Sequence, residues 1–167
     1  YTTTAWGMNG DVPVPGDYDG DGRTDIAVWR PGSGVWYVKP SASPSSYTQR
    51  LWGMNGDIPV PGDYDGDGRT DLAVRRSATG VWYVRQSSSS TGAYTSTQWG
   101  TPSDIPVPGD YDADGRTDVA VWRPDTGIWY VRPSCAGGYT AASWGTTGDT
   151  PVPGDYDGDG RIDIAVW

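Results

Sequence analysis

Short apolar segments alternate with polar, glycine-containing turns along the whole chain. In the first copy of this pattern, residues 25–31 are DIAVWRP and residues 34–40 are GVWYVKP, joined by the turn PGSG. β-Branched and aromatic residues dominate these segments, and no window has the spacing of an amphipathic helix. With the flanking segments 13–18 and 47–53, the pattern predicts four short antiparallel strands per unit. The second strand is apolar almost throughout, which is typical of a strand covered on both faces.

The pattern repeats at a nearly constant interval. The first aspartate of a recurring acidic loop, Asp17 in the first copy, returns after 46, 47 and 45 residues. Within the first copy, Trp6 lies 11 residues before Asp17 and Trp36 lies 19 residues after it. All later copies keep the first spacing, and the second and third copies keep the second. The length varies only between Trp36 and Trp52 and at the equivalent Ser-, Pro- and Gly-rich turns. We predict one domain with repeats at residues 7–52, 53–99, 100–144 and 145–167 and an outer strand at 1–6.

Tandem four-stranded units that are apolar on both faces predict an all-β propeller, because stacking around an axis buries both faces. Pro13 and Pro15 are two residues apart, so the strand lacks N–H donors along one edge, as suits an innermost strand with a free edge. The chain is predicted to form three complete blades and a split fourth, with fifteen strands in all. A single chain could close a cramped four-bladed ring, or two chains a larger ring of about eight blades, or the chain is a fragment of a longer propeller. We expect closure by self-association as a homodimer.

All 21 acidic residues are aspartates, and sixteen of them lie in four copies of one loop. In the first copy, GDYDGDGRTD, carboxylates fall at positions 1, 3, 5 and 9 counted from Asp17. Like charges this close repel one another unless a cation joins them. The loop aspartates are Asp17, Asp19, Asp21, Asp25, Asp63, Asp65, Asp67, Asp71, Asp110, Asp112, Asp114, Asp118, Asp155, Asp157, Asp159 and Asp163.

Aspartates at positions 1, 3 and 5 with glycine at position 6 follow the spacing of calcium-binding loops. The EF-hand would need Glu at position 12, where Val28 stands in the first copy, so the loop is not an EF-hand. Hard oxygen donors without His favour Ca²⁺ over zinc or copper. The main-chain carbonyl at position 7 is a further candidate ligand, and the residues there are Arg23, Arg69, Arg116 and Arg161. About four Ca²⁺ ions would bring the formal charge from −9 to about −1.

Other function classes find little support in the composition. A net charge of −9 argues against nucleic-acid binding, and no apolar run approaches the ~18 residues of a membrane span. The chain has no His and no Glu, and its one cysteine, Cys135, lies in a variable turn, so we expect no catalytic activity. The start of the chain shows neither an initiator Met nor a signal peptide, which indicates a mature form or an excised fragment.

The segment PVPGDYDGDGRTDIAVW, followed by GVWYV, resembles the FG-GAP or VCBS-type repeat of integrin-α-like propellers. The resemblance covers the whole chain and implies a calcium ion in the loop between the first and second strands of each blade. The family also includes secreted bacterial proteins, adhesion modules and sugar-binding propeller lectins. The resemblance therefore implies a secreted or cell-surface binding module, structural or adhesive, with a carbohydrate or a protein as its ligand. The alternative is an accessory propeller of a larger secreted polysaccharide-active enzyme.

Most of the ten tryptophans recur at fixed registers and are predicted to pack between blades. The second strand differs, because Trp29 and Trp122 are matched by Arg75 in the second copy. A position that accepts Arg is expected to be partly exposed, which makes Trp29 and Trp122 the candidates for ligand contact.

Overall fold

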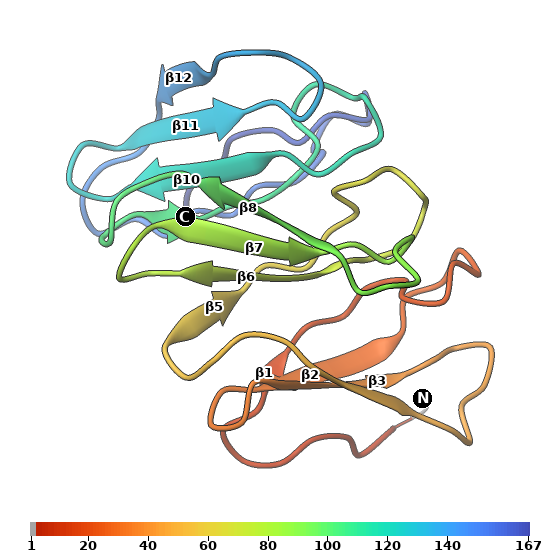
Figure 1. The fold of residues 1–167 in the computed structure, drawn as a ribbon. Coiled ribbons are helices and arrows are strands. Elements are labelled where there is room, and N and C mark those ends of the chain that lie inside the picture. The colour runs from red at the N-terminus through yellow and green to blue at the C-terminus, as the bar shows by residue number, and fades with distance from the viewer. Residues whose placement is uncertain (1–2) are drawn as a thin grey trace.

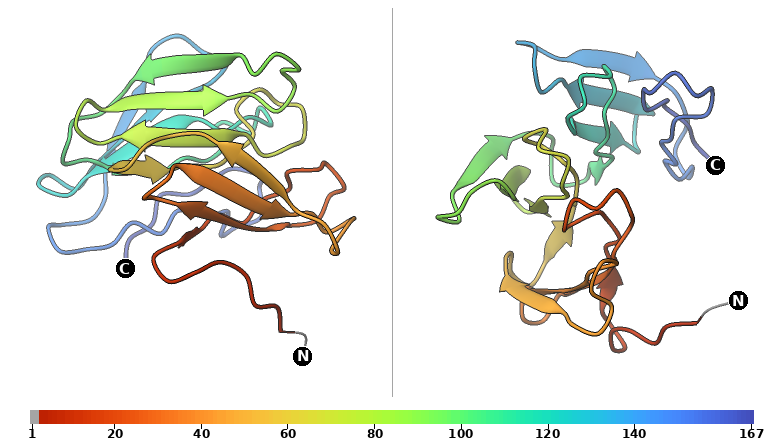
Figure 2. Two further views of the ribbon diagram at one scale, coloured as in Figure 1. Left: turned by 60° about the horizontal axis from the view of Figure 1, so that its bottom comes forward. Right: turned by 90° about the vertical axis from the view of Figure 1, so that its right-hand side faces the viewer.

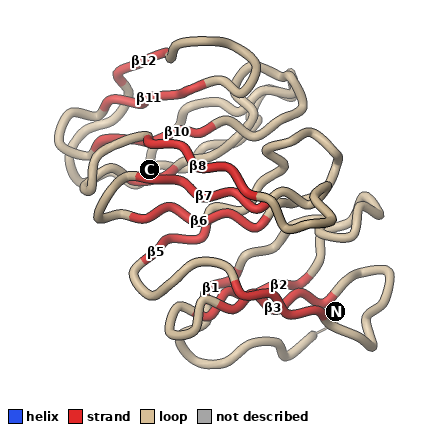
Figure 3. Tube along the Cα trace, viewed as in Figure 1, coloured by secondary structure: helices blue, strands red, loops and turns tan. Residues whose placement is uncertain are grey.

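The computed structural model describes residues 3–167 and places their strands in three four-stranded antiparallel sheets (Figure 1). No helix occurs in these residues (Figure 3). The first sheet contains β1 (Val12–Pro13), β2 (Ile26–Arg30), β3 (Val35–Lys39) and β4 (Thr48–Leu51). The second contains β5 (Asp57–Pro59), β6 (Leu72–Arg76), β7 (Val81–Arg85) and β8 (Tyr94–Gln98). The third contains β9 (Ile105–Pro106), β10 (Val119–Arg123), β11 (Ile128–Arg132) and β12 (Thr140–Ser143). Strand order follows the sequence in each sheet, which confirms the predicted four-stranded antiparallel unit.

The central hairpin of each sheet is defined by its turn. In the first sheet, β2 pairs with β3 so that Trp29 lies opposite Trp36. The turn residue Gly34 has a φ of 68°, and its N–H donates to the carbonyl of Arg30 at 2.8 Å. A Cβ at Gly34 would collide with the carbonyl oxygen of Gly53. Glycine is therefore required both by the left-handed backbone and by the close approach of the next segment.

The proline-containing strand is shorter than predicted. In the first unit only Val12–Pro13 is regular strand, although the N–H of Val14 still donates to the carbonyl of Ala27 at 3.0 Å. Beyond it, pairing resumes only as an isolated bridge between Gly16 and Asp25. The predicted edge position is confirmed, since β1, β5 and β9 each lie at one end of their sheet. Proline cannot donate to a ladder, which limits the length of this strand.

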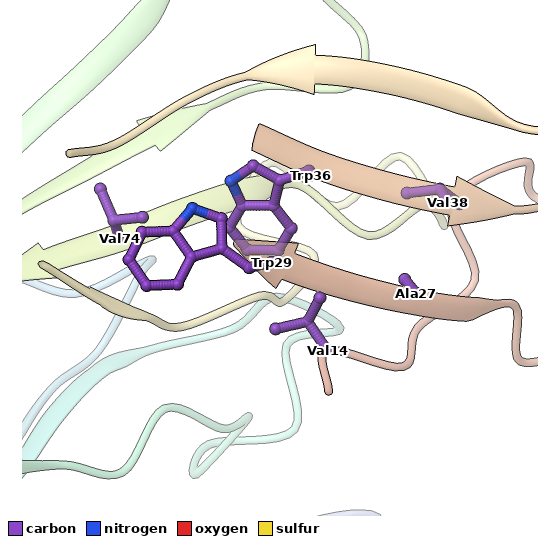
Figure 4. Close-up of a cluster of buried hydrophobic side chains, with 6 residues drawn as sticks. All are labelled: Val14, Ala27, Trp29, Trp36, Val38 and Val74. Atoms are coloured by element: carbon purple, nitrogen blue, oxygen red, sulfur yellow. The ribbon is translucent and has the colours of Figure 1, made fainter. Parts of the chain in front are cut away.

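Neighbouring sheets pack face to face through their tryptophans. Between the first two sheets, Trp29 and Trp36 lie side by side and meet Val74 of the second sheet (Figure 4). Trp36 and Trp82 are fully buried, and Trp129 is 1% exposed. Two further clusters of valine, alanine and tryptophan join the second sheet to the third and the third to the C-terminal unit, and the first of these two contains only one tryptophan, Trp82. The predicted core role is confirmed for Trp36, Trp82 and Trp129. At the other recurring register it is confirmed only in part, because Trp52 and Trp99 are partly buried against the clusters and Trp144 is 56% exposed.

The two ends of the chain contain less regular structure than predicted. Residues 3–167 form twelve strands rather than the predicted fifteen. The C-terminal unit is held only by isolated bridges, Pro151 with Val166 and Gly154 with Asp163. The outer strand predicted at 1–6 includes residues 1–2, which lie outside the described residues, and Thr3–Trp6 are not in a strand. Within residues 3–167, the two segments of the C-terminal unit pair only with each other, and no strand pairing involves Thr3–Trp6. A strand with few partners has little ladder to form.

The sheets follow one another around an arc, with both ends of the chain on its open side (Figure 2). This arrangement of four-stranded sheets is that of blades in a propeller-like fold, and the ring is not closed. Nothing in residues 3–167 forms a helix of the length and apolarity that a membrane span needs.

Candidate functional site

The acidic loop connects the first and second strands of each unit. In the first loop, the carboxylate of Asp17 accepts hydrogen bonds from the N–H groups of Gly20 at 2.7 Å and Gly22 at 2.8 Å. Both glycines have a φ of 79°, which brings successive N–H groups inward around Asp17. Ala113 takes the place of Gly20 in the third loop and keeps the same left-handed backbone, with a φ of 61°.

Each loop draws three carboxylates around one point. One oxygen from each of positions 1, 3 and 9 lies within 4.8 Å of the other two. The four groups are Asp17, Asp19 and Asp25; Asp63, Asp65 and Asp71; Asp110, Asp112 and Asp118; and Asp155, Asp157 and Asp163. The sequence placed these residues in one site, and the structure brings them together in all four copies.

The position-9 aspartate links the acidic loop to the sheet through hydrogen bonds. Asp71 is fully buried, and its two oxygens accept hydrogen bonds from the N–H groups of Tyr64 at 2.9 Å and Ser87 at 2.7 Å. Burial raises the pKa of Asp71 to about 6, and it does the same for Asp118 of the third loop. Removing a carboxylate from water disfavours its charged form, so a neighbouring cation would stabilise the ionised form of these aspartates.

The position-5 aspartate does not join the group of three. The two oxygens of Asp21 accept hydrogen bonds from the hydroxyl of Ser41 at 2.5 Å and from the N–H of Arg23 at 2.9 Å. Ser87 and Ser134 bind the position-5 aspartates Asp67 and Asp114 in the same way. Direct ligation by position 5, and by the main-chain carbonyl of position 7, stays a prediction.

The donor set fits a hard cation. In residues 3–167 the ion pairs join Arg30 to Asp11, Arg76 to Asp57 and Arg123 to Asp104, and none of them reaches a loop carboxylate. Within residues 3–167, the loop carboxylates therefore have no ion pair with a Lys or Arg side chain. Such an all-oxygen cluster suits Ca²⁺.

A family model for the FG-GAP-like repeat matches residues 17–74, 63–121 and 110–166. The chain belongs to the FG-GAP-like repeat family. Domains of such repeats are generally non-catalytic and typical of extracellular or surface proteins, and they often bind calcium. A search of curated proteins and a search of solved structures each gave no match.

The FG-GAP-like units also share a second feature, an aromatic pocket at the side of each sheet. In the second unit, Trp52, Met54, Tyr83 and Tyr94 surround a cavity of about 280 Å³ together with Arg76. The rings of Trp52 and Tyr94 lie 5.4 Å apart, and Tyr94 is 58% exposed. Equivalent cavities of about 190 and 260 Å³ are lined by Trp6, Tyr37, Tyr47 and Arg30 and by Trp99, Tyr130, Tyr139 and Arg123.

The arginine of each pocket is held in place. The guanidinium of Arg76 donates to both oxygens of Asp57 at 3.0 and 3.1 Å and lies 4.7 Å above the ring of Tyr83. In the first pocket, the hydrogen bond from Arg30 lowers the pKa of Asp11. The pocket thus has an apolar wall and a rigid polar edge.

Sequence reasoning missed these pocket residues. The signal was present, because Tyr47, Tyr94 and Tyr139 each stand five residues before a recurring tryptophan, at Trp52, Trp99 and Trp144. Each tyrosine, however, contacts the tryptophan of the preceding repeat, as Tyr94 contacts Trp52. That pairing crosses the turn of variable length and is set only by the fold.

The expectation of partial exposure at the second strand is wrong. Trp29 is 1% exposed, and Trp122 and Arg75 are fully buried. All three lie between sheets, so they offer no surface for ligand contact. Arg75 is tolerated there because its guanidinium donates to the carbonyls of Asp104 at 3.1 Å and Thr101 at 2.5 Å.

Cys135 lies beside the third loop. Its thiol donates to the carboxylate of Asp112 at 3.2 Å, and this hydrogen bond together with the nearby carboxylate of Asp114 raises the pKa of Cys135 to about 11. Ser88 makes the same contact with Asp65 in the second unit. A thiol held in its protonated form is a poor nucleophile, so Cys135 takes the place of a hydroxyl donor.

Proposed function

We propose that this chain is a calcium-binding, non-catalytic propeller module that acts outside the cell as a structural or adhesive binding unit, with carbohydrate as its ligand. The observation that carries the calcium assignment is the fourfold recurrence of carboxylate oxygens from positions 1, 3 and 9 within 4.8 Å of one another. About four Ca²⁺ ions bind per chain, one per loop.

Calcium in this setting stabilises the fold. Asp71 bridges the loop to the sheet through Tyr64 and Ser87, so a cation that neutralises it reinforces both. Binding to the folded state alone adds about 2.7 kcal/mol per site at a free concentration of 100 times the dissociation constant. Millimolar extracellular calcium suits loops of this type and supports a secreted or cell-surface location.

Titration calorimetry and thermal melting test the calcium assignment. We expect about four ions per chain and a melting temperature that rises with calcium and falls with a chelator. Asp65→Asn removes one carboxylate of the second loop at constant size and should lower the count by one. Asp125→Asn is the matched control, because Asp125 lies outside every loop and should leave the count unchanged. Equal melting temperatures with calcium and with chelator would refute the assignment.

The aromatic pockets support carbohydrate as the ligand. A sugar ring presents one face of C–H groups and an edge of hydroxyls, which match an aromatic wall and a fixed polar edge. Cavities of about 190 to 280 Å³ suit one small ring better than a large ligand. The guanidinium above Tyr83 disfavours a cationic ligand at that ring. Three pockets per chain would add avidity on a surface with repeated glycans.

Glycan-array screening of the calcium-loaded chain, followed by calorimetry with the best glycan, tests the ligand. We expect Tyr94→Ala to remove about one of three sites and the triple variant Tyr47→Ala, Tyr94→Ala, Tyr139→Ala to abolish binding. Leu51→Ala is the control, because Leu51 is 66% exposed and lies outside the pockets. Binding that survives the triple variant would overturn the pocket assignment and leave the calcium assignment intact.

Catalysis is not part of this proposal. The chain has no His or Glu, and the pKa of its one thiol is raised to about 11, so its loop aspartates are its main acid–base groups. In the proposed module, those carboxylates bind the metal.

A further inference from the structure

The two ends of the arc expose faces that the rest of the molecule buries. We call the side of the first sheet that carries Ile26 and Tyr37 the leading face, because it points away from the second sheet. We call the side of the C-terminal unit that carries Val152 and Trp167 the trailing face. Ile26 is 42% exposed, Val152 is 36% exposed and Trp167 is 89% exposed.

The trailing face consists of residue types that every internal junction buries. Val152 corresponds to Val14, Val60 and Val107, which are 2 to 3% exposed. Trp167 corresponds to Trp29, Arg75 and Trp122, which are at most 1% exposed. The trailing face thus carries the same kinds of residues as the buried junctions between units elsewhere in the chain.

The leading face is the complementary half of that interface. In the second and third sheets, the equivalents of Ile26 are Leu72 and Val119, and both pack against the buried cluster of the preceding sheet. Tyr83 and Tyr130, the equivalents of Tyr37, do the same. The first sheet has no preceding sheet among the described residues.

A main-chain hydrogen bond marks each internal junction at the acidic loops. The N–H of Thr70 donates to the carbonyl of Asp17 and that of Thr117 to the carbonyl of Asp63, both at 2.6 Å. The N–H of Ile162 donates to Asp110 at 2.7 Å. The equivalent groups at the two ends of the arc are the N–H of Thr24 and the carbonyl of Asp155. Within residues 3–167, these two groups do not form this hydrogen bond with each other.

A glycine at each junction permits this approach. A Cβ at Gly16 would lie 2.6 Å from the hydroxyl of Thr70, and one at Gly109 would lie 2.8 Å from the side chain of Ile162. At Gly154 a Cβ would meet only the exposed ring of Tyr156, at 3.3 Å or more. Gly154 therefore leaves room for a side chain that no described residue fills.

We propose that the trailing face of one copy of this chain packs on the leading face of a second copy, and that two copies close one ring. The new junction repeats the internal one, with the N–H of Thr24 donating to the carbonyl of Asp155 and Trp167 buried against the first sheet of the neighbour. Each copy contributes four repeat units, so two copies give eight, the upper end of the usual four to eight blades of a propeller. A head-to-tail contact that closes after two copies leaves no face exposed.

Light scattering coupled to size exclusion, in calcium-containing buffer and over a range of protein concentrations, tests the proposal. We expect a mass of twice the 17.9 kDa of one chain. Trp167→Asp and Gly154→Val should each yield monomers, with a dissociation constant raised about 30-fold or more, as for the loss of a central interface contact. Trp167 is too exposed in a single copy for its replacement to disturb folding.

Gly137→Val is the matched control for Gly154→Val, because a Cβ at Gly137 would have no atom within 4 Å. It should leave the dimer intact, and a thermal melt should show all three variants folded. A wild-type monomer, or a dimer that survives both Trp167→Asp and Gly154→Val, would overturn the proposal. An assembly larger than two copies would overturn the two-copy ring.

Discussion

The junction between the first and second sheets and the junction between the second and third differ at one central position. In the first, the indole of Trp29 stands beside Trp36 and donates to the carbonyl of Trp52 at 3.2 Å. In the second, Arg75 occupies the same register opposite Trp82. Both side chains are at most 1% exposed, so the two junctions are equally closed.

The difference shows that burial at this position depends on carbonyl acceptors rather than on an apolar side chain. The turn after the sheet presents main-chain carbonyls, and an indole N–H or a guanidinium can bond to them. Arg75 still has one unsatisfied donor, because its Nε finds no hydrogen-bond partner. A buried donor without a partner destabilises a fold, so the second junction is expected to be the weaker one.

The largest expected effect is the loss of stability when the central side chain of each junction is truncated to alanine, because this loss should differ between the two junctions. Trp29→Ala leaves a cavity between the first two sheets and should lower the free energy of unfolding by about 3–5 kcal/mol. Arg75→Ala should cost less, about 1–3 kcal/mol, since the side chain it removes also carried a desolvated charge. Urea unfolding of both variants in calcium measures the difference. Equal losses would mean that the two junctions contribute alike.

A smaller effect is expected when the arginine of the second junction is replaced by the tryptophan that the first junction has at the same position. Arg75→Trp removes the unbonded Nε and should raise the free energy of unfolding by about 1 kcal/mol. The space is suitable, because Trp29 passes over Gly53 as Arg75 passes over Gly100. Trp29→Arg is the reverse control and should destabilise. A loss of stability in Arg75→Trp, measured by urea unfolding, would show that the second junction is shaped for Arg.

A further effect concerns pH at the loops that lead into these junctions. Burial raises the pKa of Asp71 and Asp118 from 3.8 to about 6, so the metal-free folded state holds protons that the unfolded state releases. Stability in chelator should therefore fall as pH rises from about 4 to about 6. With calcium the trend should reverse, because the ion binds the ionised carboxylates. Melting temperatures across this range, with and without calcium, measure both slopes, and parallel slopes would contradict the metal assignment.

Local sequence signals predicted the strands and the loops well. The hairpin of residues 25–40 and its glycine turn follow from adjacent residues, and so does the acidic loop with its left-handed glycines. Two of the errors depend on longer-range contacts. The exposure of Trp29 was misjudged from Arg75, because the carbonyls that accept from Arg75 come from the next unit. The aromatic pockets were missed because Tyr94 meets a tryptophan from the preceding repeat.

The sequence by itself determined the repeat, the all-β class and the residues of the four acidic loops, since each depends on contacts within about twenty residues. Only the tertiary structure decided which faces of the sheets are covered, how Arg75 is accommodated and which aromatic side chains stay in contact with solvent. These outcomes depend on how one unit lies against the next. Packing between units joins residues about thirty or more positions apart, as Trp52 joins Tyr83, and a linear pattern does not encode that distance.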